Sequence, residues 1–487
     1  MRLVLDGKIN KTYVQTLCMM FFHGEKFPEN EESPEGILKI TTKDIDDGIF
    51  CDCELSYKDK IAKSSSFVPF ISGVKYERTS KAAVGRAVYS VGKDITGKDI
   101  DWGILTGIRP SKVAYEIYQN NGYNKAIEIL RENYLLSESK ARLSLDVAIN
   151  ENSILSKYGN NTCSIYISVP FCPTRCAYCS FVSYSTKKLF DLIPEYINRI
   201  VCELSEKINI IKRLGLKVIS VYIGGGTPTT FTHSQLEILL SRLSEEIDIF
   251  ALDEFTVECG RPDTITKEKI EVLKKYGVKR ISVNPQTLND DVLVSIGRKH
   301  TVADFFDAYS LVKEYGFDAV NTDLIAGLDG DSEESFKETI DKIIALNPEN
   351  ITVHSFSVKK SAQILKDNVN IYEKCGDVAR NCVDYSYKAL IENGYKPYYM
   401  YRQKNTIADL ENVGYSKSDK FGIYNVLMMS DRHTVFGIGA GATTKLVKNI
   451  DGKTDILRIF SKKYPYEYLQ NKDSDISQII SFFDTEK

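Results

Sequence analysis

The sequence has 487 residues, 43% of them hydrophobic and 26% charged, and its 63 basic residues nearly balance 66 acidic ones, for a net charge of −3. This composition is typical of globular proteins, and the length predicts more than one domain. The near-neutral charge argues against general binding to nucleic acid or membranes. We find no secretory h-region and no apolar run long enough to span a bilayer, so we expect a cytoplasmic protein.

Residues 1–155 predict an N-terminal α+β domain whose role the sequence does not indicate. Short β-like runs occur at Met1–Leu5 and Gly36–Thr41, and helical spacing begins near Lys81. Pro110 stands where proline is tolerated in the first turn of a helix. A second helical stretch, Ser137–Ala148, leads into the next domain.

Residues 163–360 alternate regularly between strand-like and helical stretches. The strand-like runs begin near Ile165, Val218, Glu254, Lys279, Ala319 and Ile351. The helical stretches are Lys187–Leu214, Ser234–Ile247, Thr266–Tyr276, Asp290–Ile296, Thr301–Tyr315 and Ser332–Leu346. Six strands joined by right-handed helical crossovers favour an α/β fold with a parallel, partly closed barrel.

Local signals mark several of these helix ends. Thr301 with Asp304, and Asp331 with Glu334, predict capping boxes at two helix starts. Gly277 and Gly316 predict left-handed C-terminal ends.

Three cysteines, Cys172, Cys176 and Cys179, follow the first of these strands within the stretch SIYISVPFCPTRCAYCSF (Ser164–Phe181). The other eight cysteines are scattered, which is typical of a reducing compartment. Structural zinc normally takes four ligands in two pairs, and the chain has no second CxxC or HxxxH pair. Three thiolates with one open position fit a cubane iron–sulfur cluster better. Zinc and three ordinary buried thiols are the alternatives.

Unusual polar residues and glycines fall at the C-terminal ends of the predicted strands, where β/α barrels carry their active sites. Asp323 lies within an apolar strand, so we expect it to have a polar partner. Each such residue could be a satisfied core group, but their convergence on one rim favours a site. In strand order they are Gly224–Gly226, Glu258, Asn284 with Gln286, Asp323, and His354–Ser357.

These motifs together resemble the radical S-adenosylmethionine (SAM) superfamily. The resemblance rests on Cys-x3-Cys-x2-Cys with an aromatic residue, Tyr178, before the last cysteine. With GGGTPT (Gly224–Thr229), residues 163–445 resemble more narrowly the oxygen-independent coproporphyrinogen III oxidase group and its HemZ branch. The resemblance implies a partial (β/α)6 barrel, a [4Fe-4S] cluster held by the three cysteines, and SAM as cofactors.

Residue roles follow from the same resemblance, position by position. Tyr166, Gly225 and Glu258 would contact the SAM that sits on the cluster. The group also implies a second SAM, with contacts from Tyr178, Gly226, Thr227, Gln286, Arg298, Asp323 and Ser357.

Residues 361–487 are expected to form a C-terminal domain that covers the substrate. A helix at Tyr372–Asn393 leads to the aromatic-basic run Tyr398–Lys404 and then to VFGIGAGATTK (Val435–Lys445). We do not interpret these glycines as a dinucleotide turn, because no βαβ unit with a following acidic residue surrounds them. Both segments would line a floor for a flat, carboxylated substrate, with Arg402 and Lys404 pairing with its propionates. The alternative for the basic residues is a solvated loop.

Two departures from the family pattern bear on the activity. Phe181 stands where the founding oxidases have a fourth cysteine, a loss that the haem chaperones of the family often share. Those chaperones carry a histidine–asparagine pair in a stretch that here reads IYNVLMM, with Tyr424 in the histidine place.

The activity implied by the resemblance is oxygen-independent oxidative decarboxylation of coproporphyrinogen III to protoporphyrinogen IX. A 5′-deoxyadenosyl radical would take hydrogen from the β-carbon of a propionate, and loss of CO2 and one electron would leave a vinyl group. Reduced flavodoxin or ferredoxin is the expected electron donor. The alternatives are a haem-binding or haem-trafficking protein with little catalysis, and a radical SAM enzyme acting on another substrate.

Overall fold

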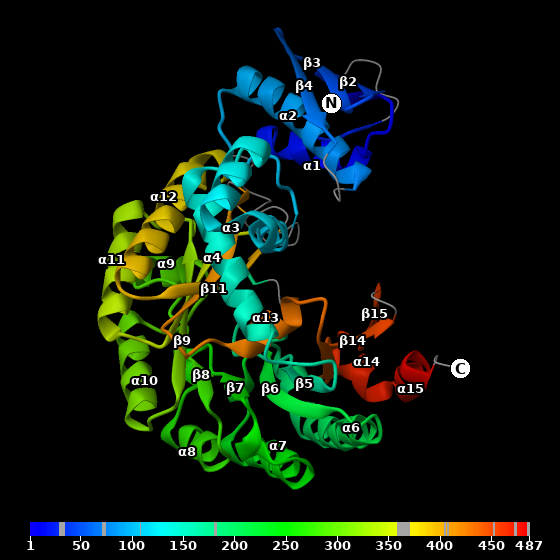
Figure 1. The fold of residues 1–487 in the computed structure, drawn as a ribbon. Coiled ribbons are helices and arrows are strands. Elements are labelled where there is room, and N and C mark those ends of the chain that lie inside the picture. The colour runs from blue at the N-terminus through cyan, green and yellow to red at the C-terminus, as the bar shows by residue number, and fades with distance from the viewer. Residues whose placement is uncertain are drawn as a thin grey trace. The chain divides into compact units, whose positions relative to one another are not determined.

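The computed structural model describes residues 1–28, 35–70, 75–107, 109–179, 183–357, 371–403, 406, 409–450, 453–471 and 475–484 (Figure 1). The chain forms two compact units. The first contains Met1–Ile149 and Met400–Gln403, and the second contains Asn150–Tyr399 and Lys404–Lys487. Within the described ranges, no helix is both long enough and apolar enough to cross a bilayer.

The first unit contains a four-stranded sheet packed against helices α1 (Lys11–Phe21) and α2 (Tyr76–Thr96). Its strands lie in chain order, and only the first pair is parallel. They are β1 (Arg2–Asp6), β2 (Gly36–Ile45), β3 (Gly48–Tyr57) and β4 (Lys60–Pro69). Helices α3 (Pro110–Tyr134) and α4 (Glu138–Leu155) follow, and α3 begins at Pro110 as predicted.

The second unit is built on an eleven-stranded sheet whose centre confirms the predicted α/β fold. Six parallel strands lie side by side in chain order, largely buried on both faces. They are β5 (Thr162–Val169), β6 (Lys217–Gly225), β7 (Glu254–Glu258), β8 (Arg280–Ser282), β9 (Ala319–Ala326) and β10 (Asn350–Ser355).

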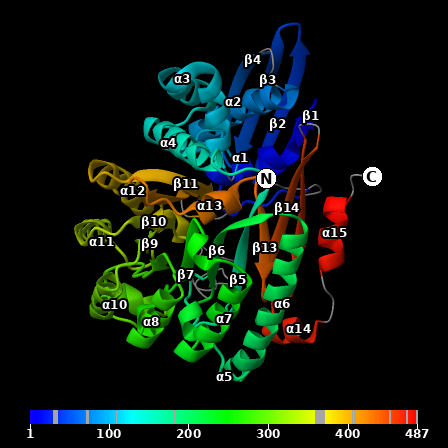
Figure 2. The same cartoon turned by 60° about the horizontal axis from the view of Figure 1, so that its bottom comes forward.

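Helices join these strands, and Figure 2 shows α6, α7, α8 and α10 along one side of the sheet. They are α5 (Lys187–Phe190), α6 (Ile193–Arg213), α7 (His233–Glu246), α8 (Lys267–Lys275), α9 (Asp290–Ser295), α10 (Val302–Glu314) and α11 (Glu333–Leu346). The helix predicted at Lys187–Leu214 is divided ahead of Pro194, because proline is tolerated in the first turn of a helix but not in its interior.

Most predicted helix ends are confirmed. Thr301 and Asp304 form a reciprocal capping box, and Gly277 and Gly316 have φ of +68° and +60°. The capping box predicted from Asp331 and Glu334 is wrong, because α11 is capped one residue later. The hydroxyl of Ser332 caps α11 instead, accepting from the Ser335 N–H at 3.1 Å, while the Asp331 carboxylate accepts from the Thr287 hydroxyl at 3.1 Å.

The C-terminal part extends the same sheet at both edges. Beyond β10 lie β12 (Glu411–Ser416), which is antiparallel to it, and β11 (Lys396–Arg402). Beyond β5 lie β13 (Thr434–Ile438), parallel to it, then β14 (Thr443–Ile450) and β15 (Lys453–Phe460). The remaining helices are α12 (Ile371–Glu392), α13 (Ile423–Met429), α14 (Pro465–Gln470) and α15 (Ile476–Asp484).

The glycines of VFGIGAGATTK allow neighbouring strands and side chains to pack closely in this sheet. A Cβ at Gly437 would lie 2.7 Å from the backbone of Thr443, and Gly439 has φ +95° with Tyr196 Oη 2.6 Å from its Cβ position. Because β13 is followed by antiparallel β14 and not by a helix, the segment contains no dinucleotide turn. The expected substrate floor is not supported here, since the side chains from Val435 to Ala440 are buried in the sheet.

One of the two proposed propionate partners, Arg402, contacts groups of the protein itself. The guanidinium of Arg402 lies 5.1 Å from the centre of the Trp102 ring and donates to the Leu105 carbonyl, which commits it to the protein. Lys404 lies outside the described residues.

Buried charges hold both ends of α13. At its start the Glu254 carboxylate accepts from the N–H groups of Ile423 at 2.5 Å and Tyr424 at 3.2 Å. At its end the Lys445 ammonium, 2% exposed, donates to the carbonyls of Leu427, Met428 and Ser430 at 2.7–3.1 Å. Charges of these signs complement the helix dipole.

We predict that Lys445→Met lowers the free energy of unfolding by about 3 kcal/mol, because it leaves buried carbonyls without a donor. Chemical denaturation followed by circular dichroism measures the change. Lys453→Met, at an exposed position of β15, is the matched control and should change stability by less than about 0.5 kcal/mol. Equal effects of the two substitutions would contradict the capping role.

Candidate functional site

The cysteine loop, residues 170–179, leaves the end of β5 and is tied to its neighbours through backbone hydrogen bonds. The carbonyls of Val169 and Phe171 accept from Gly226 and Thr227 at 2.7 and 2.8 Å. On its other side, the Cys172 N–H donates to the Tyr184 carbonyl at 3.1 Å. The loop therefore starts in a fixed direction at the C-terminal edge of the sheet.

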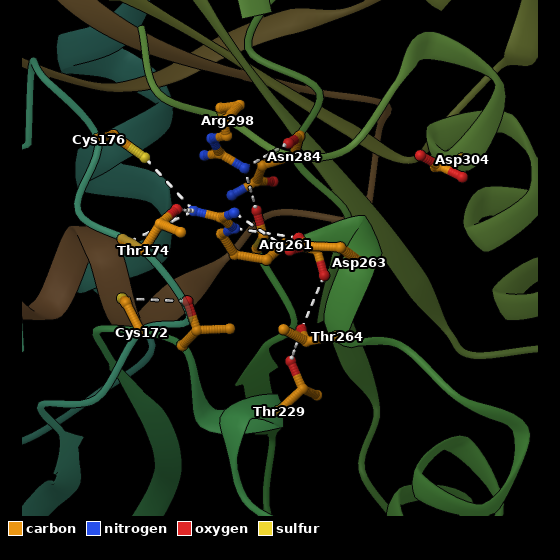
Figure 3. A network of polar contacts seen from close by, with 12 residues as sticks. Cys172, Thr174, Cys176, Thr229, Arg261, Asp263, Thr264, Asn284, Arg298 and Asp304 are labelled. Atoms are coloured by element: carbon orange, nitrogen blue, oxygen red, sulfur yellow. Dashed lines mark hydrogen bonds and ion pairs between the residues drawn. The ribbon is translucent and has the colours of Figure 1, made fainter. Parts of the chain in front are cut away.

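Each of the three thiols contacts a polar group. Cys172 Sγ lies 3.3 Å from Thr227 Oγ1, Cys176 Sγ lies 3.6 Å from Arg261 Nη1, and Cys179 Sγ lies 3.9 Å from Ser183 Oγ. Figure 3 shows Cys172 and Cys176 facing this network.

The buried Cys172 thiol needs a nearby cation to become a thiolate ligand. The pKa of Cys172 is raised to about 11, mainly by burial and to a smaller extent by the nearby thiols of Cys179 and Cys176, while the Thr227 hydrogen bond lowers it. The thiol loses its proton only when a cation, such as iron, binds the sulfur and stabilises the thiolate. In the described ranges no three metal-ligating side chains are grouped for a single ion. A cube takes one thiolate on each of separate irons. Phe181 lies outside the described residues.

The glycines at the end of β6 allow close approach of this loop. Gly225 has φ +109°, and its Cβ position lies 3.2 Å from Ser168 Oγ and 3.3 Å from Tyr166 Oη. A Cβ at Gly226 would lie 2.6 Å from the Phe171 carbonyl oxygen. Gly226 is thus required by the cysteine loop itself, apart from any ligand.

Glu258 ends β7 beside a group of stacked tyrosines. Tyr222 Oη donates to its Oε1, and the Gly225 N–H donates to Oε2 at 3.3 Å. The Tyr222 and Tyr424 rings stack at 4.4 Å, and Tyr166 stacks on Tyr424 at 6.0 Å. Burial raises the pKa of Glu258 to about 7, with a further contribution from Asp323, while the bonds from Tyr222 and Gly225 lower it.

Asp323 has the polar partners that the sequence predicts. Asn284 Nδ2 and Asn321 Nδ2 donate to its two carboxylate oxygens, each at 2.7 Å, and His354 Nε2 lies 3.9 Å away. Gln286, a non-glycine residue with φ +70°, is held in this costly conformation because its N–H donates to the Asp323 carbonyl at 3.0 Å and its own carbonyl accepts from Ile325.

Arg298 connects the cysteine loop with these strand ends. Its guanidinium donates to Tyr178 Oη at 2.9 and 3.2 Å and to the carbonyls of Gly260 and Asn284 at 3.0 and 3.3 Å. These partners are neutral oxygens, so a buried positive charge stands next to the loop. Ser357, by contrast, pairs through its backbone with Thr406 beyond the end of β10.

The predicted residues thus come from one edge of the parallel strands, as expected for a barrel. Contacts run from Cys172 to Thr227 and from Tyr178 through Arg298 and Asn284 to Asp323. Sequence reasoning missed Tyr222, Arg261 and Asn321 as members of the network. Arg261 lies three residues after the end of β7, so its place near a strand end was a usable signal.

The raised pKa of Glu258 predicts a pH-dependent stability difference. Its pKa is about 7 in the folded protein and near 4.5 in the unfolded chain. Between pH 4.5 and pH 7 the folded protein therefore keeps the carboxyl protonated while the unfolded chain releases the proton. Through this group, wild-type stability falls as the pH rises across that window. Glu258→Gln removes this dependence, and its stability relative to wild type should rise by about 3 kcal/mol from pH 4.5 to 7.5.

Denaturant unfolding of the metal-free protein across this pH range measures the difference. Glu314→Gln, which removes an exposed carboxylate of α10, controls for the change in charge. A stability difference between Glu258→Gln and wild type that does not change with pH would contradict the raised pKa.

Comparison with known proteins places this site in a family. Residues 166–343 match the model of the radical SAM superfamily. The chain is 34% identical over 394 residues to the oxygen-independent coproporphyrinogen-III oxidase-like protein HemZ of Bacillus subtilis, covering 80% of this chain and 78% of that protein. It is also 35% identical over 198 residues to the haem chaperone HemW of B. subtilis, covering 40% of this chain and 51% of HemW.

Among solved structures, the coproporphyrinogen III oxidase HemN of Escherichia coli has the same fold. The TM-score is 0.51 at 19% identity, covering 68% of this chain and 72% of HemN. The superfamily uses a [4Fe-4S] cluster and SAM, and three thiols on one loop suit that cluster. The chain therefore belongs to the radical SAM superfamily, within the group of oxygen-independent coproporphyrinogen III oxidase-like proteins that includes HemZ.

Proposed function

We propose that the protein is a radical SAM enzyme that converts propionates of coproporphyrinogen III to the vinyl groups of protoporphyrinogen IX without oxygen. The observation that carries this proposal is the network joining the cysteine loop to Asp323 through Arg298. In this proposal the polar groups of the network, which lie next to the thiols, would contact SAM. The similarity to HemZ over most of both chains supports the substrate class.

Cys172, Cys176 and Cys179 would hold the cluster, which with SAM supplies one-electron chemistry that removes a hydrogen atom from the propionate β-carbon. The carboxyl of Glu258 would pair with the ammonium of SAM, because a cation there offsets the cost of ionising a buried acid. Tyr166 and Gly225, which lie next to Glu258, would contact the same SAM.

A second SAM would lie along Arg298 and Asp323. The Arg298 guanidinium, already oriented by Tyr178, suits a carboxylate, since its planar fork can bind two oxygens. The Asp323 carboxylate is fixed by two amide donors and retains lone pairs for ligand hydroxyls. Gly226, Thr227, Gln286 and Ser357 complete the proposed contacts.

The C-terminal part would close the substrate side of the site through α13. The substrate radical would lose CO2 and pass one electron to an external one-electron acceptor, which leaves the vinyl group. Reduced flavodoxin or ferredoxin would supply the electron that reduces the cluster. Side chains that exclude water would protect the radical.

The similarity to HemW favours haem binding as a second candidate. Tyr424, at the position of the chaperones' histidine, argues against it. Burial raises the pKa of Tyr424 well above its usual value, so the phenol stays protonated between stacked rings. Iron would therefore have to displace this proton and separate Tyr424 from the rings stacked on it.

Anaerobic turnover of reconstituted protein with dithionite, SAM and coproporphyrinogen III tests the proposal. We expect 5′-deoxyadenosine and vinyl-containing products together, and loss of both in Cys176→Ala. Cys202→Ala, which removes an exposed thiol on α6, should retain both.

Chromatography of both products distinguishes the alternatives. Deoxyadenosine without any change in the porphyrinogen would reject this substrate. The absence of both products, together with a stoichiometric haem Soret band, would favour the haem-binding candidate.

A further inference from the structure

Arg261 lies three residues after the end of β7, and its side chain reaches the cysteine loop. Arg261 is buried, with only 3% of its surface exposed. Burying a positive charge is costly unless it is paired and hydrogen-bonded. Asp263 provides that pairing, and the remaining guanidinium nitrogen, Nη1, lies beside the thiols.

The contacts of Arg261 fix the direction of one N–H group. Nε and Nη2 donate to the two carboxylate oxygens of Asp263, each at 3.1 Å, in a bidentate pair. This leaves Nη1 on the side of the cysteine loop, 2.8 Å from Thr174 Oγ1 and 3.6 Å from Cys176 Sγ. Figure 3 shows the guanidinium between Asp263 and the two loop residues.

We propose that Arg261 is a positioning residue that donates a charge-assisted hydrogen bond to the Cys176 thiolate and raises the reduction potential of the cluster. Hydrogen bonds to cluster sulfurs and nearby charge set cluster potentials. Reduction adds one negative charge, so a fixed positive charge and an N–H donor at the thiolate favour the reduced state.

This inference rests on the assignment of the cluster to the three cysteines and does not depend on the substrate. A purely structural role is the competing explanation, because Thr174 also donates to the Gly297 carbonyl at 3.2 Å and Arg261 could simply hold the loop. A measurement of potential separates the two explanations, since a structural tie would change cluster content and not the potential.

Redox titration of the reconstituted protein, followed by electron paramagnetic resonance (EPR), tests the proposal. We expect Arg261→Gln to disfavour the reduced cluster about tenfold, which lowers the midpoint potential by about 59 mV for one electron. Arg261→Lys should shift it in the same direction by less, because one ammonium cannot hold Asp263 and reach Cys176 together. Arg242→Gln removes the same charge from a half-buried site on α7 and should leave the potential unchanged.

Several outcomes would overturn the inference. One is an unchanged potential in Arg261→Gln with wild-type iron content. If Arg261→Gln binds no iron, a wild-type potential in Arg261→Lys overturns it, and so does loss of iron in both variants. Full iron and an unchanged EPR signal in Cys176→Ala would overturn it together with the cysteine assignment. A failure of porphyrinogen turnover alone would reject only the proposed substrate.

Discussion

The candidate site depends on the backbone hydrogen bonds that fix the cysteine loop to the end of β5. A free loop carrying three thiols would lose conformational entropy on closing around a cluster. Here the first turn is already held, because Gly226 and Thr227 donate to carbonyls on either side of Pro170. The same bonds bring Thr227 Oγ1 within 3.3 Å of Cys172 Sγ. A glycine at 226 is needed for that approach, which links the GGGTP motif to the loop geometry.

Around this loop the protein holds charged groups, buried or half-buried, that a stable core alone would avoid. Glu258, Asp323, Arg261 and Arg298 all lie near the C-terminal ends of parallel strands, and each is held by at least two hydrogen bonds. Such groups are oriented before any ligand binds, so binding needs little reorganisation. The extensive apolar interior of the strands and of helices such as α6 supplies the stability that this arrangement costs.

The strands and helices of the barrel could be predicted because each is encoded by the hydrophobic pattern of its own residues. Periodicity located the six parallel strands and their helices, and Thr301–Asp304 marked a real cap. The β3–β4 hairpin was missed although Ile49, Cys51, Cys53 and Leu55 alternate as strand residues do.

The parallel pairing of β13 with β5 joins residues about 270 positions apart, and no local pattern encodes it. Tyr424 was noted only as a departure from the chaperones, because its stacking on Tyr166 depends on that distant packing. The Asp331 cap failed because two neighbouring residues could both cap α11, and only packing decides between them.

The central claim is that three thiols beyond β5 hold a [4Fe-4S] cluster with one iron open to SAM. EPR spectra of the reduced, reconstituted protein with and without SAM test this most directly. Our account predicts one cluster per chain whose signal changes when SAM is added, and loss of that signal when Cys172, Cys176 and Cys179 are all replaced by alanine. A cluster signal that ignores SAM, or that survives the triple replacement, would contradict it.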